Sequence, residues 1–337
     1  MLFVIWERGD GGMKESGAIQ KLLDDFMKES HALGFSYKTD EDCIRRFLRS
    51  YVESHNGEIE FTKQYVLENT RRKPNQCNNT VLRDISAINC FLRFVQRKGY
   101  NAYCIPIRSL PKENRNFTAY IFSESEIQRI LAAADSLPFS TQSPNRHHQI
   151  PVMFRILFNC GLRISELRNL RVCDVDMEEQ LFIVLDTKFH KSRLVPFSKA
   201  IAESLAAYFS KVEHKGPDDW LFPSPKATEK YTSSGQQAHF ALLLRLAGIP
   251  RGGRGKGPRL HDIRHTFAVH CLSNWVRSGV DLLTALPVLS RYLGHSGIKG
   301  TQKYLQLTAQ MYPHIVSDLE EKFGALIPSL EVQHEAV

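Results

Sequence analysis

Apolar residues recur at helical spacing in three segments of the first hundred positions. Residues 19–29 and 39–51 each place them on one face, as an amphipathic helix does. The third segment is the most regular, with intervals of four, three, four and three between Val81, Ile85, Ile88, Leu92 and Val95. Thr80 or Asn79 is suited to cap this helix at its start, and Gly99 to end it. The pattern predicts an all-helical first part of the chain.

The periodic pattern stops between Ile105 and Asn116, where prolines and charges replace it. Such a stretch is typical of a linker between domains. The pattern resumes at Ser123, which opens a Ser-x-x-Glu capping box and predicts a helix up to residue 137. The polar residues 138–149 that follow predict a loop that exposes its two histidines, His147 and His148.

The second half of the chain mixes two periods. Two short apolar runs, 181–185 and 194–197, flank a polar connector and predict a β-hairpin. The remaining apolar patterns predict helices around 153–158, 166–170, 201–212, 239–247, 263–275 and 282–293. We therefore expect a mainly α protein with a small β-sheet, in which a helical domain precedes an α+β domain. The expected boundaries are a disordered leader at 1–15, a helical domain at 16–108, a linker at 109–120, the α+β domain at 121–327 and a tail at 328–337.

Composition narrows the function. The chain of 337 residues has a net charge of +8 and a pI of about 9.1, which favours a polyanionic partner. Its seven cysteines are scattered and lack the spacing of a zinc site or a redox pair, which favours a reducing cytoplasm. No run reaches the roughly 18 apolar residues that a membrane span needs, so we expect no membrane partner.

Four short stretches of the second half carry basic or imidazole groups beside structural residues. In a phosphodiester exchange without metal, the planar and permanently charged forks of Arg163 and Arg264 suit the non-bridging oxygens of the transition state. His261 lies three residues before Arg264, so on a helix both project from one face. Lys188, on the hairpin connector, is placed to give a proton to the leaving 5′ oxygen.

The candidate nucleophile is Tyr304, nine positions after His295. A phenol with an ordinary pKa near 10 needs nearby positive charge to attack, which His295 and the arginines can supply. Further basic clusters suit a DNA backbone, with a solvated surface as the alternative reading; they are Arg71, Arg72, Lys73, Arg93, Arg97, Arg251, Arg254, Lys256 and Arg259.

Together these motifs resemble the signature of tyrosine recombinases, also called phage-type integrases. The resemblance rests on Gly-Leu-Arg163-Ile-Ser-Glu-Leu, Lys188 on a hairpin ending Arg-Leu-Val-Pro, His261-x-x-Arg264-His-Thr-Phe-Ala, Leu-Gly-His295 and Tyr304. It covers residues 123–326 strongly, and 37–98 is similar, less specifically, to the helical core-binding domain of that family.

The resemblance implies a role for each matched residue. Arg163, Arg264 and His295 would bind the scissile phosphate, His261 would assist proton movement and Lys188 would be the general acid. Tyr304 would form a 3′-phosphotyrosyl bond, and Glu166 would support the site from behind. The family needs no metal or nucleotide cofactor and acts as a homotetramer on two DNA duplexes; accessory recombination proteins are further possible partners.

Several alternatives stay open on the sequence. Lys191 and Arg193 share the hairpin with Lys188 and compete for its role. An amphipathic segment, 315–326, is expected to form a helix that docks either on its own chain or on the next protomer. Integration, excision or transposition of a mobile element is favoured over chromosome-dimer resolution. An inactive DNA-binding regulator of this fold and a type IB topoisomerase are the rival functions.

Overall fold

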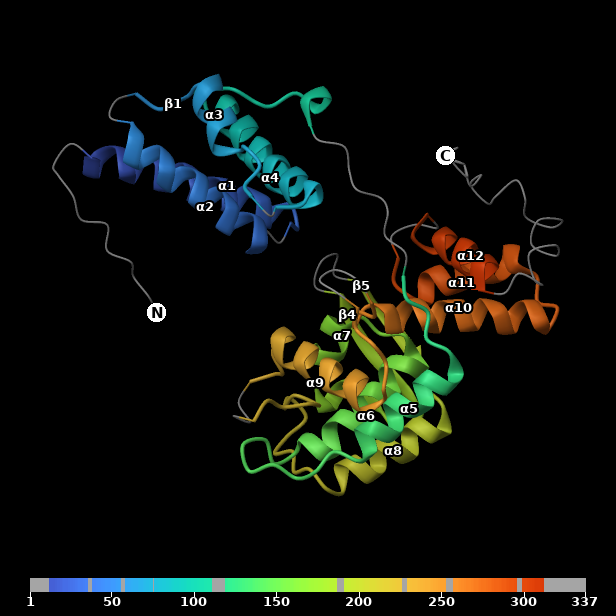
Figure 1. Ribbon diagram of the computed structural model, residues 1–337. Coiled ribbons are helices and arrows are strands. Elements are labelled where there is room, and N and C mark those ends of the chain that lie inside the picture. Colours follow the sequence, from blue (N-terminus) through green and yellow to red (C-terminus); the bar gives the residue numbers. More distant parts are fainter. Residues whose placement is uncertain are drawn as a thin grey trace. The chain divides into compact units, whose positions relative to one another are not determined.

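The computed structural model of the chain divides into two compact units, Met1–Phe117 and Thr118–Val337 (Figure 1). Each unit has its own buried apolar core and is described by itself. The described residues are 12–35, 38–55, 58–74, 76–110, 119–186, 191–225, 229–252, 257–295 and 299–311. Within them, no helix is both long and apolar enough to cross a membrane.

The first unit is a helical bundle. Its helices are α1 (Gly12–Ala32), α2 (Lys38–Ser54), α3 (Lys63–Asn69) and α4 (Asn78–Arg97), with short strands β1 (Glu60–Phe61) and β2 (Asn101–Ala102) paired in parallel. The five apolar positions that define the period of α4 are all buried in the core of this unit. The three helices predicted from the first hundred residues are confirmed.

The ends of α4 differ in how well they follow the sequence. Gly99 has φ +90° and donates its backbone N–H to Gln96, so it ends the helix as predicted. The predicted N-cap was wrong, because the helix begins at Asn78 and Cys77 occupies the cap position. The sulfur of Cys77 lies 3.1 Å from the Thr80 hydroxyl, so the threonine sits inside the first turn.

Among its described residues, the second unit packs eight α-helices and a small sheet. Their order is α5 (Glu124–Asp135), α6 (Arg146–Cys160), α7 (Ile164–Asn169), β3 (Val175–Asp176), β4 (Leu181–Asp186), β5 (Lys191–Pro196), α8 (Lys199–Phe209), α9 (Ser233–Leu246), α10 (Asp262–Arg277), α11 (Leu282–Tyr292) and α12 (Lys299–Met311). Strands β3, β4 and β5 form an antiparallel sheet, which confirms the predicted hairpin. Phe182, Val184 and Val195 point from the hairpin into the main core.

The start of α6 corrects one prediction. Residues 138–149 were expected to be a loop, but the helix begins at Arg146 and includes both histidines. The rings of His147 and His148 lie 3.8 Å apart, that of His147 contacts Phe139, and both residues are half-buried rather than exposed. The first turn of α6 could not be predicted from apolar periodicity, because its side chains are polar and contact one another instead of forming an apolar stripe.

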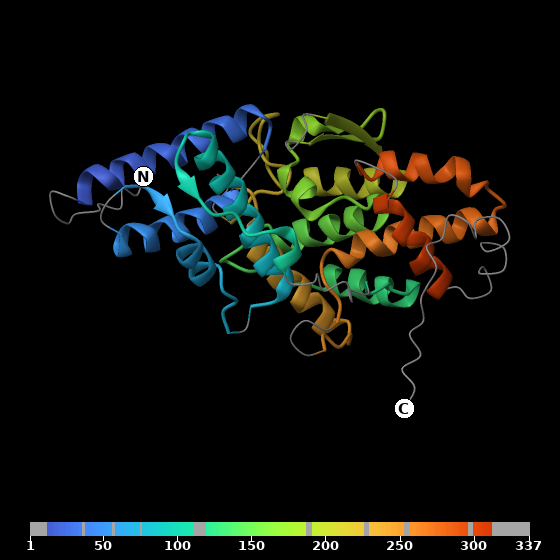
Figure 2. The same ribbon diagram turned by 90° about the horizontal axis from the view of Figure 1, so that it is seen from above.

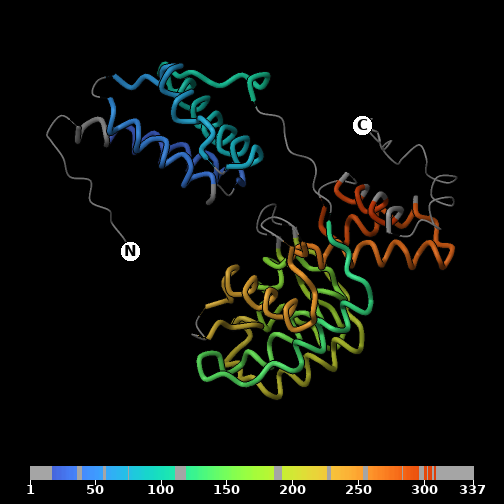
Figure 3. The backbone as a smooth tube through the Cα atoms, viewed as in Figure 1, coloured from blue at the N-terminus to red at the C-terminus, as the bar shows by residue number. Residues whose placement is uncertain are grey.

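Helices α10, α11 and α12 pack together around a second apolar cluster of the same unit. They form the orange and red group at one side of the unit in Figure 1, and remain adjacent in the perpendicular view of Figure 2. The segment before α5 crosses α10 near the start of that helix, as the tube in Figure 3 shows, and the N–H of Phe122 donates to the Thr266 hydroxyl at 3.0 Å. This packing brings the start of α10 close to α7, where Nη1 of Arg264 lies 3.8 Å from Oε2 of Glu166, and α11 close to β5.

Candidate active site

The turn between α6 and α7 positions Arg163. Gly161 ends α6 with φ +58°, and a Cβ there would lie 2.2 Å from the ring of Phe267, so the close approach requires glycine. Arg163 is the N-cap of α7, and its Nη1 donates to Glu166 Oε1 at 2.6 Å. Its Nη2 donates to the carbonyl of Gly294 at 2.7 Å. The guanidinium is thus held at two points while its side chain stays one-third exposed.

Glu166 joins two arginines from different elements. Arg193, on β5, donates Nη1 and Nη2 to the two oxygens of Glu166 at 2.9 and 2.8 Å, and its Nε donates to the carbonyl of Tyr292 at 2.7 Å. Burial alone would raise the pKa of Glu166, but the hydrogen bonds and charge of Arg193, with those of Arg163, hold it below its ordinary value. The carboxylate is therefore charged at neutral pH and orients both guanidinium groups.

Arg264 is buried in the first turn of α10. Its Nη1 donates to the carbonyl of Gly161 at 3.0 Å, and its Nη2 donates to the carbonyl of Leu293. Burial, and then the charge of Arg163, lower the pKa of Arg264 to about 10. The group stays protonated at neutral pH, so a permanent positive charge lies beneath the surface of the site.

His295 lies between Arg264 and α12. Its Nε2 is 3.3 Å from Nη2 of Arg264, and its Nδ1 is 2.9 Å from the hydroxyl of Thr301. A guanidinium can only donate, so Nε2 must accept and the proton of the neutral ring resides on Nδ1. Burial, and then the charges of Arg264 and Arg163, lower the pKa of His295 to about 4, in agreement with this neutral tautomer.

Tyr304 lies on α12 with only 1% of its surface exposed. Burial raises the pKa of its hydroxyl above the ordinary value, whereas the charge of Arg264, a hydrogen bond from Arg264 and the charge of Arg163 act to lower it. Its ring lies 6.0 Å from that of His295 and 5.5 Å from that of His265. The phenol therefore lies beside the two histidine rings and within the electrostatic reach of Arg264 and Arg163.

Two histidines at the start of α10 complete the cluster. His261 is the N-cap of the helix, and its ring lies 4.8 Å from that of His265. Desolvation, and then the charge of Arg264, lower the pKa of His261 to about 4. Burial, and then the charge of Lys303, lower the pKa of His265 to about 3. Both rings are neutral at neutral pH.

The structure thus brings together most of the residues singled out from the sequence. One linked cluster contains Arg163, Glu166, His261, Arg264, His295 and Tyr304. Lys188, Arg254, Lys256 and the segment 315–326 lie outside the described residues. The sequence analysis did not identify Thr301 and Lys303, and it considered Arg193 only as a rival to Lys188. The position of Arg193 directly before Leu-Val-Pro at the end of the hairpin was the signal that could have identified it as a site residue.

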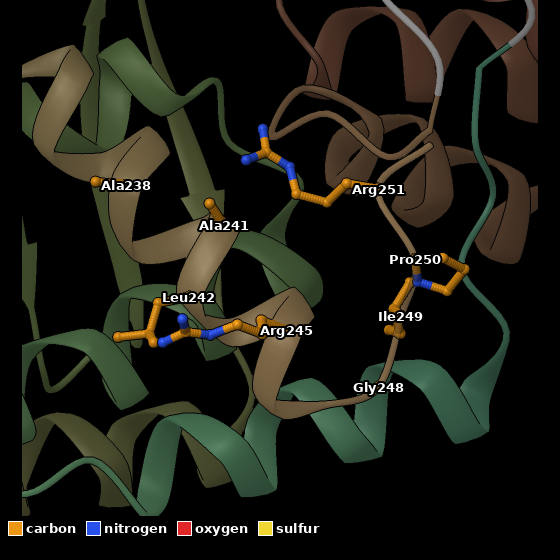
Figure 4. A pocket seen from close by; sticks show the side chains of 8 residues that line it. All are labelled: Ala238, Ala241, Leu242, Arg245, Gly248, Ile249, Pro250 and Arg251. Atoms are coloured by element: carbon orange, nitrogen blue, oxygen red, sulfur yellow. The ribbon is translucent and has the colours of Figure 1, made fainter. Parts of the chain in front are cut away.

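The predicted DNA-backbone residues are exposed wherever the structure describes them. In the first unit Arg97 forms an ion pair with Glu29, whereas Arg71, Lys73 and Arg93 extend from the surface. In the second unit Arg259 is bound to Asp262 at 3.0 Å. A pocket of about 980 Å³ lies beside the exposed Arg251, and Figure 4 shows its lining, formed by Ala238, Ala241, Leu242, Arg245, Gly248, Ile249, Pro250 and Arg251.

Comparison with known proteins finds a matching family model and relatives that are similar in sequence over most of the chain. Residues 121–311 match the model of the phage integrase family. The putative integrase/recombinase y4rB of Sinorhizobium fredii is 27% identical over 309 residues, covering 90% of this chain and 98% of that protein. The tyrosine recombinase XerD of Caulobacter vibrioides is 30% identical over 290 residues, covering 83% of this chain and 88% of that protein.

Solved structures support the same fold. A XerH site-specific recombinase bound to its difH substrate superposes with a TM-score of 0.60 at 17% identity, covering 89% of this chain and 84% of that chain. The Tn1549 transposon integrase in complex with transposon right end DNA gives a TM-score of 0.57 at 14% identity, covering 88% and 99%. At these identities the likeness shows the fold, and it confirms the predicted mainly α class with a small sheet.

Proposed function

Because this chain belongs to the phage integrase family and is a tyrosine-type site-specific recombinase, we propose that it cuts and rejoins duplex DNA with Tyr304 as its nucleophile. The Tyr304 hydroxyl attacks a DNA phosphate, forms a 3′-phosphotyrosyl bond and releases the 5′ oxygen of the broken strand. Attack by a 5′ hydroxyl then rejoins the DNA and frees the tyrosine. Each step exchanges one phosphate ester for another, so the bond energy is conserved. The family match favours this activity over a type IB topoisomerase or an inactive regulator.

One observation carries the assignment of the nucleophile. Tyr304 is a buried phenol on which the positive charges of the buried Arg264 and of Arg163 both act, and its ring lies 6.0 Å from that of His295, which Arg264 contacts. A surface tyrosine that merely packs would not sit against a guanidinium that is 98% buried. Positive charge favours the phenolate over the phenol, which is what attack on phosphorus requires.

The arginines take the charge that develops on the phosphate. Arg163 uses two of its five donors on described residues, and its partly exposed fork can direct others to a non-bridging oxygen. Arg264 adds its charge from beneath. Removing one such preorganised contact typically lowers the rate about 100- to 1000-fold.

Protons are handled by the neutral imidazoles and a lysine. His261, neutral in the free protein, accepts the tyrosine proton or relays it. His295 can donate to the phosphate from Nε2 only after it has gained a proton, because in the free protein Nε2 accepts from Arg264. Lys188 protonates the leaving 5′ oxygen. This last role rests on the position of Lys188 in the hairpin connector of the sequence.

Duplex DNA is the proposed substrate, and a mobile element its proposed source. The excess of basic residues and the exposed arginines of both units support backbone binding. The name of the y4rB relative and the transposon origin of a structural neighbour support integration, excision or transposition. We further propose a homotetramer on paired sites, with accessory proteins as possible partners.

Covalent trapping tests this function. The purified chain first selects the duplexes that it binds from a random-sequence pool. A set of these duplexes is then prepared, each with a nick next to a different phosphate. Cleavage at that phosphate releases a short fragment, so the DNA cannot be rejoined and the enzyme stays covalently attached. We expect a denaturant-resistant protein–DNA adduct from the wild type and from Tyr312→Phe, and none from Tyr304→Phe. Both variants should bind DNA with wild-type affinity. An adduct that survives in Tyr304→Phe would overturn the proposal.

A further inference from the structure

Lys303 directly precedes the proposed nucleophile and its ammonium group reaches the same cluster. Its Nζ lies 5.4 Å from the centre of the Tyr304 ring. The two residues share α12 with Thr301, whose hydroxyl holds His295. Lys303 is therefore on the segment that carries both the nucleophile and a support of the site, although it is not one of the signature residues of the sequence motif.

The charge of Lys303 acts on the other groups of the cluster. It lowers the pKa of His261, His265 and His295, so its ammonium lies near all three rings. Burial first, and then the charges of Arg264 and Arg259, lower the pKa of Lys303 itself. The position of Nζ over the Tyr304 ring places the lysine on the side of α12 that faces the cluster, where its side chain remains exposed to solvent.

Lys303 has no anionic partner to balance its charge within the described part of the chain. The nearest carboxylate that acts on it, Asp262, is already bound by Arg259 at 3.0 Å. Glu166 is likewise bound by Arg163 and Arg193. In the described site, five cations therefore surround two carboxylates. Such an excess is unfavourable until an anion enters, and a DNA phosphate is the anion that the proposed function brings.

We propose that Lys303 is a further catalytic residue, whose Nζ contacts a non-bridging oxygen of the phosphate that Tyr304 attacks. The inference rests on the proposed function of Tyr304. Lysine suits this position because it is a compact point charge on a flexible stem that can swing from the ring toward an entering phosphate. Its contact strengthens as negative charge accumulates on the phosphorane, so it acts mainly on the rate of cleavage.

Single-turnover cleavage separates this role from a structural one. Lys303→Gln should lower the cleavage rate at saturating protein at least tenfold, with the DNA dissociation constant changed less than threefold and an unchanged unfolding midpoint. Lys303→Arg should recover most of the rate. Lys199→Gln removes the same charge from an exposed position on α8 and should cleave as the wild type does.

A neutral phosphate provides the direct test of contact. In a methylphosphonate substrate, a methyl group replaces one non-bridging oxygen and removes the negative charge. On this substrate the rate penalty of Lys303→Gln should shrink to less than threefold. An equal penalty on both substrates, or no penalty on the ordinary one, overturns the inference. Because these rates are measured on wild-type adduct formation at Tyr304, a wild type that forms no adduct refutes the proposed function instead.

Discussion

Replacing Glu166 by glutamine removes the charge that joins Arg163 to Arg193. The carboxylate is 91% buried and accepts four hydrogen bonds of 2.6–2.9 Å from the backbone of Arg163 and from the two guanidinium groups. Breaking one partner of a buried ion pair costs about 3–5 kcal/mol, because the remaining charge stays buried without compensation. For a unit of this size, that corresponds to a fall of about 6–20 °C in the unfolding midpoint.

A double-mutant cycle measures the interaction itself. Urea unfolding followed by circular dichroism would compare Glu166→Gln, Arg193→Gln and the double variant, in which two neutral amides face each other. We expect the double variant to lose at least about 1 kcal/mol less than the two single losses together. Glu203→Gln, at an exposed position of α8, is the control and should change the stability by less than about 0.5 kcal/mol. Additive losses, or a single variant as stable as the control, would refute the central place given to this carboxylate.

Three further outcomes follow from the site. His265 has a folded-state pKa of about 3, below that of the unfolded chain, so the unfolded chain binds more protons. The free energy of unfolding therefore falls as pH drops from 6.5 toward 3, by up to about 1.4 kcal/mol per pH unit. The difference in urea midpoint between wild type and His265→Gln should shift with pH, and a constant difference speaks against a buried neutral ring. Thr301→Val removes the partner of His295 and should slow single-turnover cleavage about tenfold, whereas Thr301→Ser keeps the hydroxyl and the rate; equal rates would contradict this pairing. Gly161→Ala should destabilise the second unit by more than about 1 kcal/mol, because the new Cβ meets a ring carbon at 2.2 Å with φ at +58°. As the control, the Cβ of Gly216→Ala meets nothing within 4 Å, and this variant should melt near the wild type. Similar melting of both variants would show that the backbone adjusts freely.

Regular elements were predictable where one face of a segment is apolar. The period of α4 and the two apolar runs of the hairpin each specify burial directly, and both elements form as expected. The first turn of α6 could not be found in this way, because His147 and His148 are stabilised by contacts between rings rather than by an apolar stripe. The predicted N-cap of α4 was wrong because local sequence did not fix the start of the helix: a threonine suits the first turn of a helix as well as its cap position.

The candidate site was predictable where chemistry and motif coincide. Arg163, Arg264, His295 and Tyr304 carry groups that a metal-free phosphoryl transfer needs, and the fold brings them into one cluster. Supporting contacts were harder to anticipate. The pairing of Arg193 with Glu166 spans 27 positions and depends on how β5 packs against α7, which no local pattern encodes.

Mass spectrometry of the trapped adduct tests the central claim most directly. Trypsin cleavage after Lys303 and Lys322 releases one peptide that contains two tyrosines, Tyr304 and Tyr312. After the DNA is trimmed by nuclease, fragmentation of this peptide locates the nucleotide to a single side chain. The account predicts a 3′-linked nucleotide on Tyr304 and an unmodified Tyr312. A nucleotide on Tyr312, or on any other residue of the chain, would contradict it.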